Sequence, residues 1–157
     1  MKETIITKAD LNERNEYAAS ADLHVDGTLI IESGLGIVVF RGSLSAKASI
    51  VAKAGSGITA GWSIKADGSI TADGSITADG SIKADGSIKA GLAVRCKKSI
   101  RSKLRIFAGL CMWRLPKPEE MIVECAELKS GVVAFGELRL VSTNQEKAKG
   151  YNDATQR

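Results

Sequence analysis

Residues 57–108 repeat with a period of six residues, and this period constrains the fold more than any other feature of the chain. The first complete unit begins two residues earlier, at Gly55, and from there to Ala108 the chain reads GSGITA GWSIKA DGSITA and so on through nine six-residue units, called hexads here, in one register. Each hexad has a branched aliphatic residue followed, two positions later, by a small residue. The aliphatic positions are Ile58, Ile64, Ile70, Ile76, Ile82, Ile88, Val94, Ile100 and Ile106. The small positions are Ala60, Ala66, Ala72, Ala78, Ala84, Ala90, Cys96, Ser102 and Ala108.

Each hexad has the pattern of one short strand and one corner. In Ser-Ile-Lys-Ala, alternation places Ile and Ala on one face of the strand and Lys on the other. The Asp-Gly that follows predicts a corner, because Asp bonds its local backbone and Gly accepts a positive φ. Strands this short cannot bury a face alone, so a fixed short period indicates stacked coils.

Three hexads, about 18 residues, would make one triangular coil, with successive coils about 4.8 Å apart. The sequence therefore predicts an all-β, single-stranded parallel β-helix, that is, a triangular solenoid. A set of antiparallel hairpins is the weaker alternative, because Asp-Gly hairpins normally join longer strands.

The order of residues within a hexad distinguishes two known kinds of solenoid. In the left-handed acyltransferase type, a small residue lies two positions before the aliphatic one, which Gly, Ala, Glu or Asp usually follows. Here Lys or Thr follows it, and the position two before is Gly68, Gly74, Gly80 or Gly86. Over about residues 21–141, the Gly-x-Ile-x-Ala order resembles the polymer-forming bactofilins. This resemblance implies a right-handed triangular helix, and right-handed crossovers are also the rule for parallel strands.

The repeat predicts a solenoid domain over residues 23–141. We expect residues 1–22, which carry three basic and five acidic residues, to cap the first coil, and a short helix over about residues 8–19 is an alternative there. The predicted apolar contacts of this cap are Ile5, Ile6, Leu11 and Tyr17. Residues 142–157 are polar without a period and are predicted to form a flexible tail.

The register is less regular before residue 57. Leu35 and Ile37 are predicted to face inward, and a slip follows at residues 38–40. A two-residue insertion in the segment AGSG then restores the phase at Ile58. We expect bulges or longer corners at these places.

Residues 109–120, GLCMWRLPKPEE, break the period with two prolines and are predicted to form an inserted loop. Pairs two residues apart then resume at six-residue steps, which predicts one more coil over residues 121–141. The alternative is a hairpin about Lys129-Ser130-Gly131 that covers the exposed sheet edge.

Composition limits the possible functions. The chain is 44% hydrophobic and 25% charged, as expected of one soluble domain. Aromatic residues make up only 4%, which argues against a roomy ligand cavity. The chain has no run of 18 apolar residues and no apolar signal core near its N-terminus, so we expect a cytoplasmic protein. Three cysteines without paired spacing are expected to be free thiols, with Cys96 buried.

Candidate catalytic groups are few. His24 is the only histidine and is predicted to point outward between Leu23 and Val25. A hexapeptide acyltransferase needs a catalytic histidine, and a solenoidal carbonic anhydrase would need three to bind zinc. Cys111 has no adjacent base in the sequence. We therefore predict that the protein is not an enzyme and has no metal or cofactor.

Charge is the strongest functional signal. The period predicts three outward stacks: Lys65, Lys83 and Arg101; Thr59, Thr77 and Arg95; and Thr71, Lys89 and Phe107. From Arg95 to Lys117 there are eight basic residues and no acidic one. Clustered Lys and Arg favour phosphate backbones or acidic protein surfaces. A solvated surface that prevents end-to-end stacking is the alternative. The candidate basic binding face comprises Lys65, Lys83, Arg95, Lys97, Lys98, Arg101, Lys103 and Arg105.

The inserted loop adds a second candidate contact region, formed by Trp113, Arg114 and Lys117. Loops on rigid scaffolds often carry recognition residues, and Trp and Arg are frequent interface hot spots. In the alternative interpretation, Met112 and Trp113 fold back and plug the last coil.

Three functional hypotheses follow. In the first, the protein is a non-enzymatic binding protein that presents the basic face and the loop to a protein or protein–nucleic acid complex. Such a protein could be a stoichiometric inhibitor or adaptor from a phage or other mobile element, for example an anti-defence protein. In the second, it is a bactofilin-like scaffold that assembles end to end or through sheet edges. In the third and weakest, it is a hexapeptide-type acyltransferase.

Overall fold

The protein is a parallel β-helix in which strands from successive coils form three long faces. We analysed a computed structural model, which describes residues 2–141; the predicted tail over residues 142–157 lies outside this range. Face A contains β2 (Leu23–Val25), β5 (Leu44–Ala46), β8 (Ile64–Ala66), β11 (Ile82–Ala84) and the first halves of β14 (Ser99–Phe107) and β16 (Glu127–Phe135).

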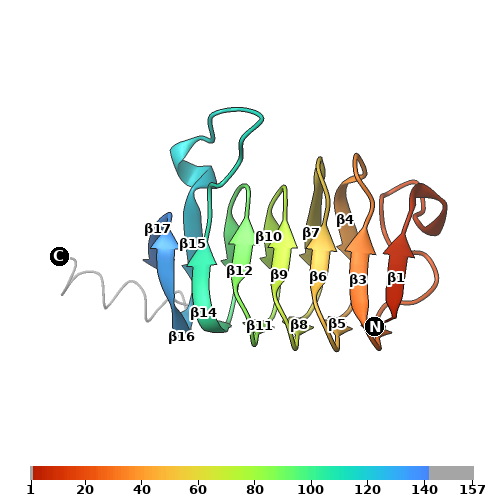
Figure 1. Ribbon diagram of the computed structural model, residues 1–157, viewed down its shortest axis with the longest axis horizontal. Helices are drawn as coiled ribbons and strands as arrows, with labels where there is room; N and C mark the ends of the chain where they lie inside the picture. The colour runs from red at the N-terminus through yellow and green to blue at the C-terminus, as the bar shows by residue number, and fades with distance from the viewer. Residues whose placement is uncertain (1, 142–157) are drawn as a thin grey trace.

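Face B contains β1 (Glu3–Ile6), β3 (Thr28–Ile31), β6 (Ile50–Ala52), β9 (Ile70–Ala72), β12 (Ile88–Ala90) and the second halves of β14 and β16. Face C contains β4 (Gly36–Phe40), β7 (Ser56–Ala60), β10 (Ile76–Ala78), β13 (Val94–Cys96), β15 (Ile122–Cys125) and β17 (Glu137–Leu140). The chain visits the faces in the order A, B, C, and the coils follow one another along the long axis of the molecule (Figure 1).

Strand pairing confirms the predicted coil length. In the regular part, Ile64 pairs with Ile82 and Ile82 with Ile100, a step of 18 residues. Leu44 pairs with Ile64, a step of 20 residues, as the two-residue insertion predicts. The same parallel register repeats on all three faces, so each side chain lies above its counterpart in the preceding coil.

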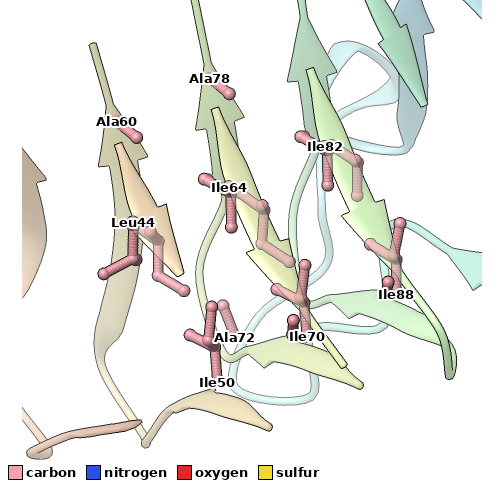
Figure 2. Close-up of a cluster of buried hydrophobic side chains, with 14 of the residues drawn as sticks. Leu44, Ile50, Ala60, Ile64, Ile70, Ala72, Ala78, Ile82 and Ile88 are labelled. Carbon is pink, nitrogen blue, oxygen red and sulfur yellow. The ribbon is translucent and has the colours of Figure 1, made fainter. Parts of the chain in front are cut away.

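The interior is a continuous stack of the aliphatic and small hexad residues. Ile64, Ile70, Ile76, Ile82 and Ile88 are fully buried. The side chains of Ile64, Ile70, Ile82 and Ile88 point inward from their strands, toward the interior that they share with the small alanines (Figure 2). The narrow interior leaves room for short aliphatic side chains, which explains the low aromatic content.

The corners differ from the prediction in one physical respect. The Asp-Gly glycines do not have a positive φ, whereas Gly34, Gly55 and Gly109 do. Glycine is needed at the Asp-Gly corners because the coils approach closely: a Cβ on Gly80 would lie 2.7 Å from Ser63 Oγ. That hydroxyl instead accepts a hydrogen bond from the backbone N–H of Ser81 in the next coil. Ser69, which follows the corner Asp67-Gly68, accepts a hydrogen bond from the Ser87 N–H at 3.0 Å in the same way, so these serines tie successive coils together.

The N-terminal segment covers the first coil, but not as a helix. β1 pairs in parallel with β3, and Ile6 is buried. A 3-10 helix follows at Lys8–Asp10, and Leu11 and Tyr17 pack against the core. The predicted helix over residues 8–19 is therefore wrong beyond its first turn. Ile5 is half exposed and does not contribute to the core.

In strand β4, the residues that face inward differ from the prediction. Ile37 is 52% exposed, whereas Val38 and Phe40 are fully buried. Gly34 and Gly36 both have a positive φ at the start of this strand, so the slip occurs earlier than expected. The ring of Phe40 packs against Tyr17 from the cap, with 5.7 Å between ring centroids.

The C-terminal strands form one further coil and no hairpin. β15 pairs in parallel with β13 and with β17, and β16 pairs in parallel with β14. Gly131 has a positive φ at the corner of β16, where a hairpin turn was the alternative. A short 3-10 helix at Pro118–Glu120 ends the inserted loop, which projects from the coil between β14 and β15 (Figure 1).

Candidate functional site

Face A carries a column of basic side chains on its outer surface. Lys65, Lys83 and Arg101 are direct partners in adjacent strands, which confirms the stacking predicted from the period. Adjacent strands are about 4.8 Å apart, so the three cations follow the solenoid axis in even steps. All three side chains are exposed. Within residues 2–141, no carboxylate forms an ion pair with any of them.

Basic residues also border face A at its two corners. Lys97 Nζ lies 3.7 Å from Asp79 Oδ1, and Lys103 Nζ lies 3.8 Å from Asp85 Oδ2. Lys98 and Arg105 also lie at these corners and have no ion-pair partner in the part of the chain that the structure describes. These four corner residues are Lys97, Lys98, Lys103 and Arg105. Seven of the eight basic residues selected from the sequence therefore gather on one side of the solenoid.

Arg95 is the residue that does not join this surface. It lies on face C, where its strand partners are Thr77 and Glu124. Arg95 Nε donates to Glu124 Oε1 at 3.2 Å, and Nη2 donates to the Glu119 carbonyl at 3.0 Å. The first contact joins two strands of face C, and the second holds the end of the inserted loop against the solenoid. Arg95 therefore has a local structural role.

The inserted loop is braced by its own charged residues. Arg114 makes two hydrogen bonds to the Glu120 carboxylate, at 2.7 and 2.9 Å. This contact, followed by the backbone N–H of Lys117, lowers the pKa of Glu120 to about 2. Arg114 also lies over the Trp113 ring, 4.8 Å from its centroid. Trp113 Nε1 donates to Asp73 Oδ2 at 2.8 Å, which ties the loop back to an earlier coil.

The loop does not plug the last coil. Met112 is 95% exposed, Leu115 is 88% exposed and Trp113 is half exposed. Ala108 and Ile122, on either side of the loop in the sequence, are buried. The loop therefore presents apolar side chains outward from a rigid base.

The loop and the basic column lie on opposite sides of the solenoid. The loop joins the end of β14, which pairs with β12 on face B, to β15 on face C. In a triangular coil, the corner between faces B and C is opposite face A. The residues Trp113, Arg114 and Lys117 thus form a surface separate from the column of Lys65, Lys83 and Arg101.

Trp62 is an exposed aromatic residue that the sequence interpretation overlooked. It occupies the corner between faces C and A and is 62% exposed. It stands at the position that Gly80 fills one coil later, and Gly80 donates its backbone N–H to the Trp62 carbonyl at 2.7 Å. The signal was present in the hexad GWSIKA, the only one with Trp at the corner-glycine position. It places a large aromatic ring at the border of the basic face.

The candidate catalytic groups are not assembled. His24 points outward on face A, with Nδ1 2.7 Å from Ser45 Oγ and Nε2 3.5 Å from Asp26 Oδ1. Cys111 lies in the inserted loop at the opposite corner, where its N–H donates to the Gly91 carbonyl. No histidine–cysteine pair for acyl transfer forms between these two residues. Among the described residues, no cluster of His, Cys, Asp and Glu could hold a metal ion.

The other two cysteines are core residues. Cys96 and Cys125 are buried and face inward from adjacent strands of face C. A hydrogen bond with Cys125, together with burial, raises the pKa of Cys96, and Cys96 Sγ contacts the Ser99 carbonyl at 3.4 Å. Cys96 therefore remains a protonated thiol and acts as a small apolar side chain, as predicted from its hexad position.

No protein-family model matches the sequence, and no curated protein or solved structure matches it either. Within residues 2–141, no helix is long and apolar enough to cross a membrane.

Proposed function

We propose that this protein is a non-enzymatic binding protein that presents face A to an acidic macromolecular partner. The observation that carries the proposal is the in-register column of Lys65, Lys83 and Arg101, which lacks ion-pair partners within residues 2–141. Lys98 and Arg105 extend this column at its corners. These five residues are the unpaired cations of face A.

The column contributes nothing that the solenoid needs to fold. Its side chains are exposed, and the stacked Ile and Ala residues beneath them form the core. Like charges on directly opposed strand positions repel one another. A bound polyanion would relieve this repulsion and release its own counterions. The arrangement therefore favours binding of an acidic surface.

The position of the loop favours an adaptor over a single flat interface. Face A and the loop lie on opposite sides, so one flat partner surface cannot cover both. Met112 and Leu115 offer an apolar contact and the unpaired cations an electrostatic one. In this proposal, the protein bridges two partners or two parts of one complex. Inhibition of a nucleic-acid-handling complex is one form that such bridging could take.

The test is a charge reversal on face A with a matched control. The variant K65E/K83E/R101E and the control K53E/K89E/R139E change the net charge equally, but the control residues lie on faces B and C or at their shared corner. We expect the face A variant to elute from immobilised heparin at much lower salt and to lose its partner from host lysate. We expect the control to behave more like the wild type.

Circular dichroism and thermal unfolding should show that both variants stay folded. An equal loss of binding in the two variants would mean that only net charge matters. Unchanged partner recovery by the face A variant would refute the proposal.

Self-association is a second candidate function, favoured by the ends of the solenoid. β1 and β2 are edge strands at the N-terminal end, where Leu11 and Tyr17 pack against the core, and within residues 2–141 β16 and β17 are the edge strands at the C-terminal end. Val132, Leu138 and Leu140 are exposed at this end. Unpaired sheet edges with apolar side chains favour pairing with another chain. Because these exposed apolar side chains gather at the C-terminal end, here called the open end, the pairing of two open ends into a closed dimer is favoured over a growing filament.

A further inference from the structure

We infer that face A binds single-stranded nucleic acid, with Trp62 stacking on a base while the unpaired cations of face A contact backbone phosphates. This inference rests on the proposed binding function and adds the chemical class of the partner. The inference is based on Trp62, at the corner between faces C and A. Binding of a partner to the basic column alone would not explain why this large ring is exposed.

The corner between faces C and A forms a hydrogen-bonded column of four residues. Trp62 N–H donates to the Gly42 carbonyl at 3.2 Å, Gly80 N–H to the Trp62 carbonyl at 2.7 Å, and Lys98 N–H to the Gly80 carbonyl at 3.1 Å. Trp62 and Lys98 are thus two strand spacings apart, roughly 9.6 Å. Gly80 adds no side chain between them. The corner column therefore has no side chain between Trp62 and Lys98.

The indole of Trp62 has no structural task that would explain its exposure. Its side chain makes no hydrogen bond, aromatic contact or cation–π contact within residues 2–141. Trp113 differs on each point, because its N–H is bonded to Asp73 and its ring lies under Arg114. Large exposed aromatic rings without a packing role are typical of binding surfaces.

Most of the cations near Trp62 lack a carboxylate partner within residues 2–141, and Lys97, in the same corner, is the exception because it pairs with Asp79. Lys65 lies three residues beyond Trp62 on face A, and Lys83 and Arg101 continue the column from it. Lys98 stands in the corner column itself. An aromatic ring beside a row of unpaired cations is the combination that binds single strands, because bases stack on the ring and phosphates contact the cations.

Two other polyanions fit this surface less well. In a duplex the base faces are stacked on one another, so only the charged column would be used. An acidic protein would likewise be held by charge and has no general need for a flat ring. Because the backbone of Trp62 is fixed between two coils, a single strand would meet a stacking platform that is already in position.

The test measures binding of a fluorescein-labelled oligothymidylate of about 12 nucleotides by anisotropy. The variants are W62A, the matched control W113A, and K65E/K83E/R101E. We expect W62A to weaken binding about 5- to 150-fold, the range typical of one lost base stack. We expect W113A to bind like the wild type, and a duplex of the same length to bind more weakly than the single strand.

A second readout uses the two tryptophans as reporters, because the chain contains only Trp62 and Trp113. In W113F, fluorescence comes from Trp62 alone, and we expect the oligonucleotide to quench it. In W62F, only Trp113 emits, and we expect no quenching. This readout is independent of any change in affinity.

The results distinguish failure of the stacking inference from failure of the proposed function. If W62A binds the single strand as tightly as the wild type, or the duplex binds equally well, the stacking inference is wrong and the charged face stands. If the oligonucleotide does not bind but K65E/K83E/R101E loses a protein partner, the inference is overturned in favour of an acidic protein. If that charge reversal affects no partner at all, the proposed function fails as well.

Discussion

The inward register of face A can be tested by one pair of neighbouring substitutions, Ile82→Ala and Lys83→Ala. Ile82 is fully buried between Ile64 and Ile100, its partners in the adjacent coils. The substitution removes Cγ1, Cγ2 and Cδ1, which costs about 2.4 kcal/mol in lost transfer free energy. The cavity adds to this cost, because the hydrogen bonds of the adjacent coils prevent collapse.

We therefore expect Ile82→Ala to lower the free energy of unfolding by about 4 kcal/mol, within the roughly 2–5 kcal/mol range of such substitutions. At about 2–4 °C per kcal/mol for a chain of this size, Tm should fall by about 8–16 °C. Lys83→Ala removes an exposed side chain, and its effect should stay within about 0.5 kcal/mol.

Urea denaturation followed by circular dichroism and by tryptophan fluorescence measures both changes. Trp62 and Trp113 report on different coils, so coincident transitions would also show that the solenoid unfolds as one unit. The reasoning would be refuted if Ile82→Ala cost less than about 1 kcal/mol, or if Lys83→Ala were the more damaging change. Either result would mean that the strand presents its other face to the core.

Two further predictions concern the loop and the open end. The pKa of Glu120 is lowered to about 2 by Arg114, so its stabilising contribution is present above the ordinary pKa and is lost as pH falls toward 2. NMR titration of the Glu120 carboxyl should give a midpoint near 2, and Arg114→Met should move it toward about 4.3; a wild-type midpoint near the ordinary value would contradict this. If the open end forms a dimer, sedimentation velocity should show a discrete dimer that Leu138→Glu dissociates. A sharp monomer at high protein concentration would remove self-association.

The period predicts much of the fold because each strand follows from a local rule. Alternation within the hexad determines which side chain faces inward, and counting hexads determines which side chains stack. Both rules hold for Lys65, Lys83 and Arg101, whose pairing follows from the 18-residue coil alone. They fail at Ile37, because positive-φ glycines change the direction of the chain there and no repeat reports them.

The candidate site was less predictable, because it depends on contacts between distant residues. The hydrogen bond from Trp113 to Asp73 joins residues 40 positions apart, and no local pattern announces it. The sequence also did not show which cations form ion pairs. Lys97 and Lys98 are neighbours of the same residue type, yet within residues 2–141 only Lys97 of the two has a carboxylate beside it. Trp62 could have been found from its place in the hexad, but it stands apart from the basic run that dominated the interpretation.

Because each hexad forms one face of a coil, deleting whole hexads changes the solenoid in a way that depends on their number. Deleting three hexads, about 18 residues, would shorten the solenoid by one strand spacing, roughly 4.8 Å, and leave every column aligned. Deleting a single hexad, such as residues 73–78, would instead turn everything after it by one third of a turn. Lys83 and Arg101 would leave the column of Lys65, and the loop would emerge at the corner between faces A and B. The number of hexads therefore determines both the distance and the angle between the basic column and the inserted loop. Removing three hexads changes only the distance along the axis, whereas removing one hexad changes the angle around it.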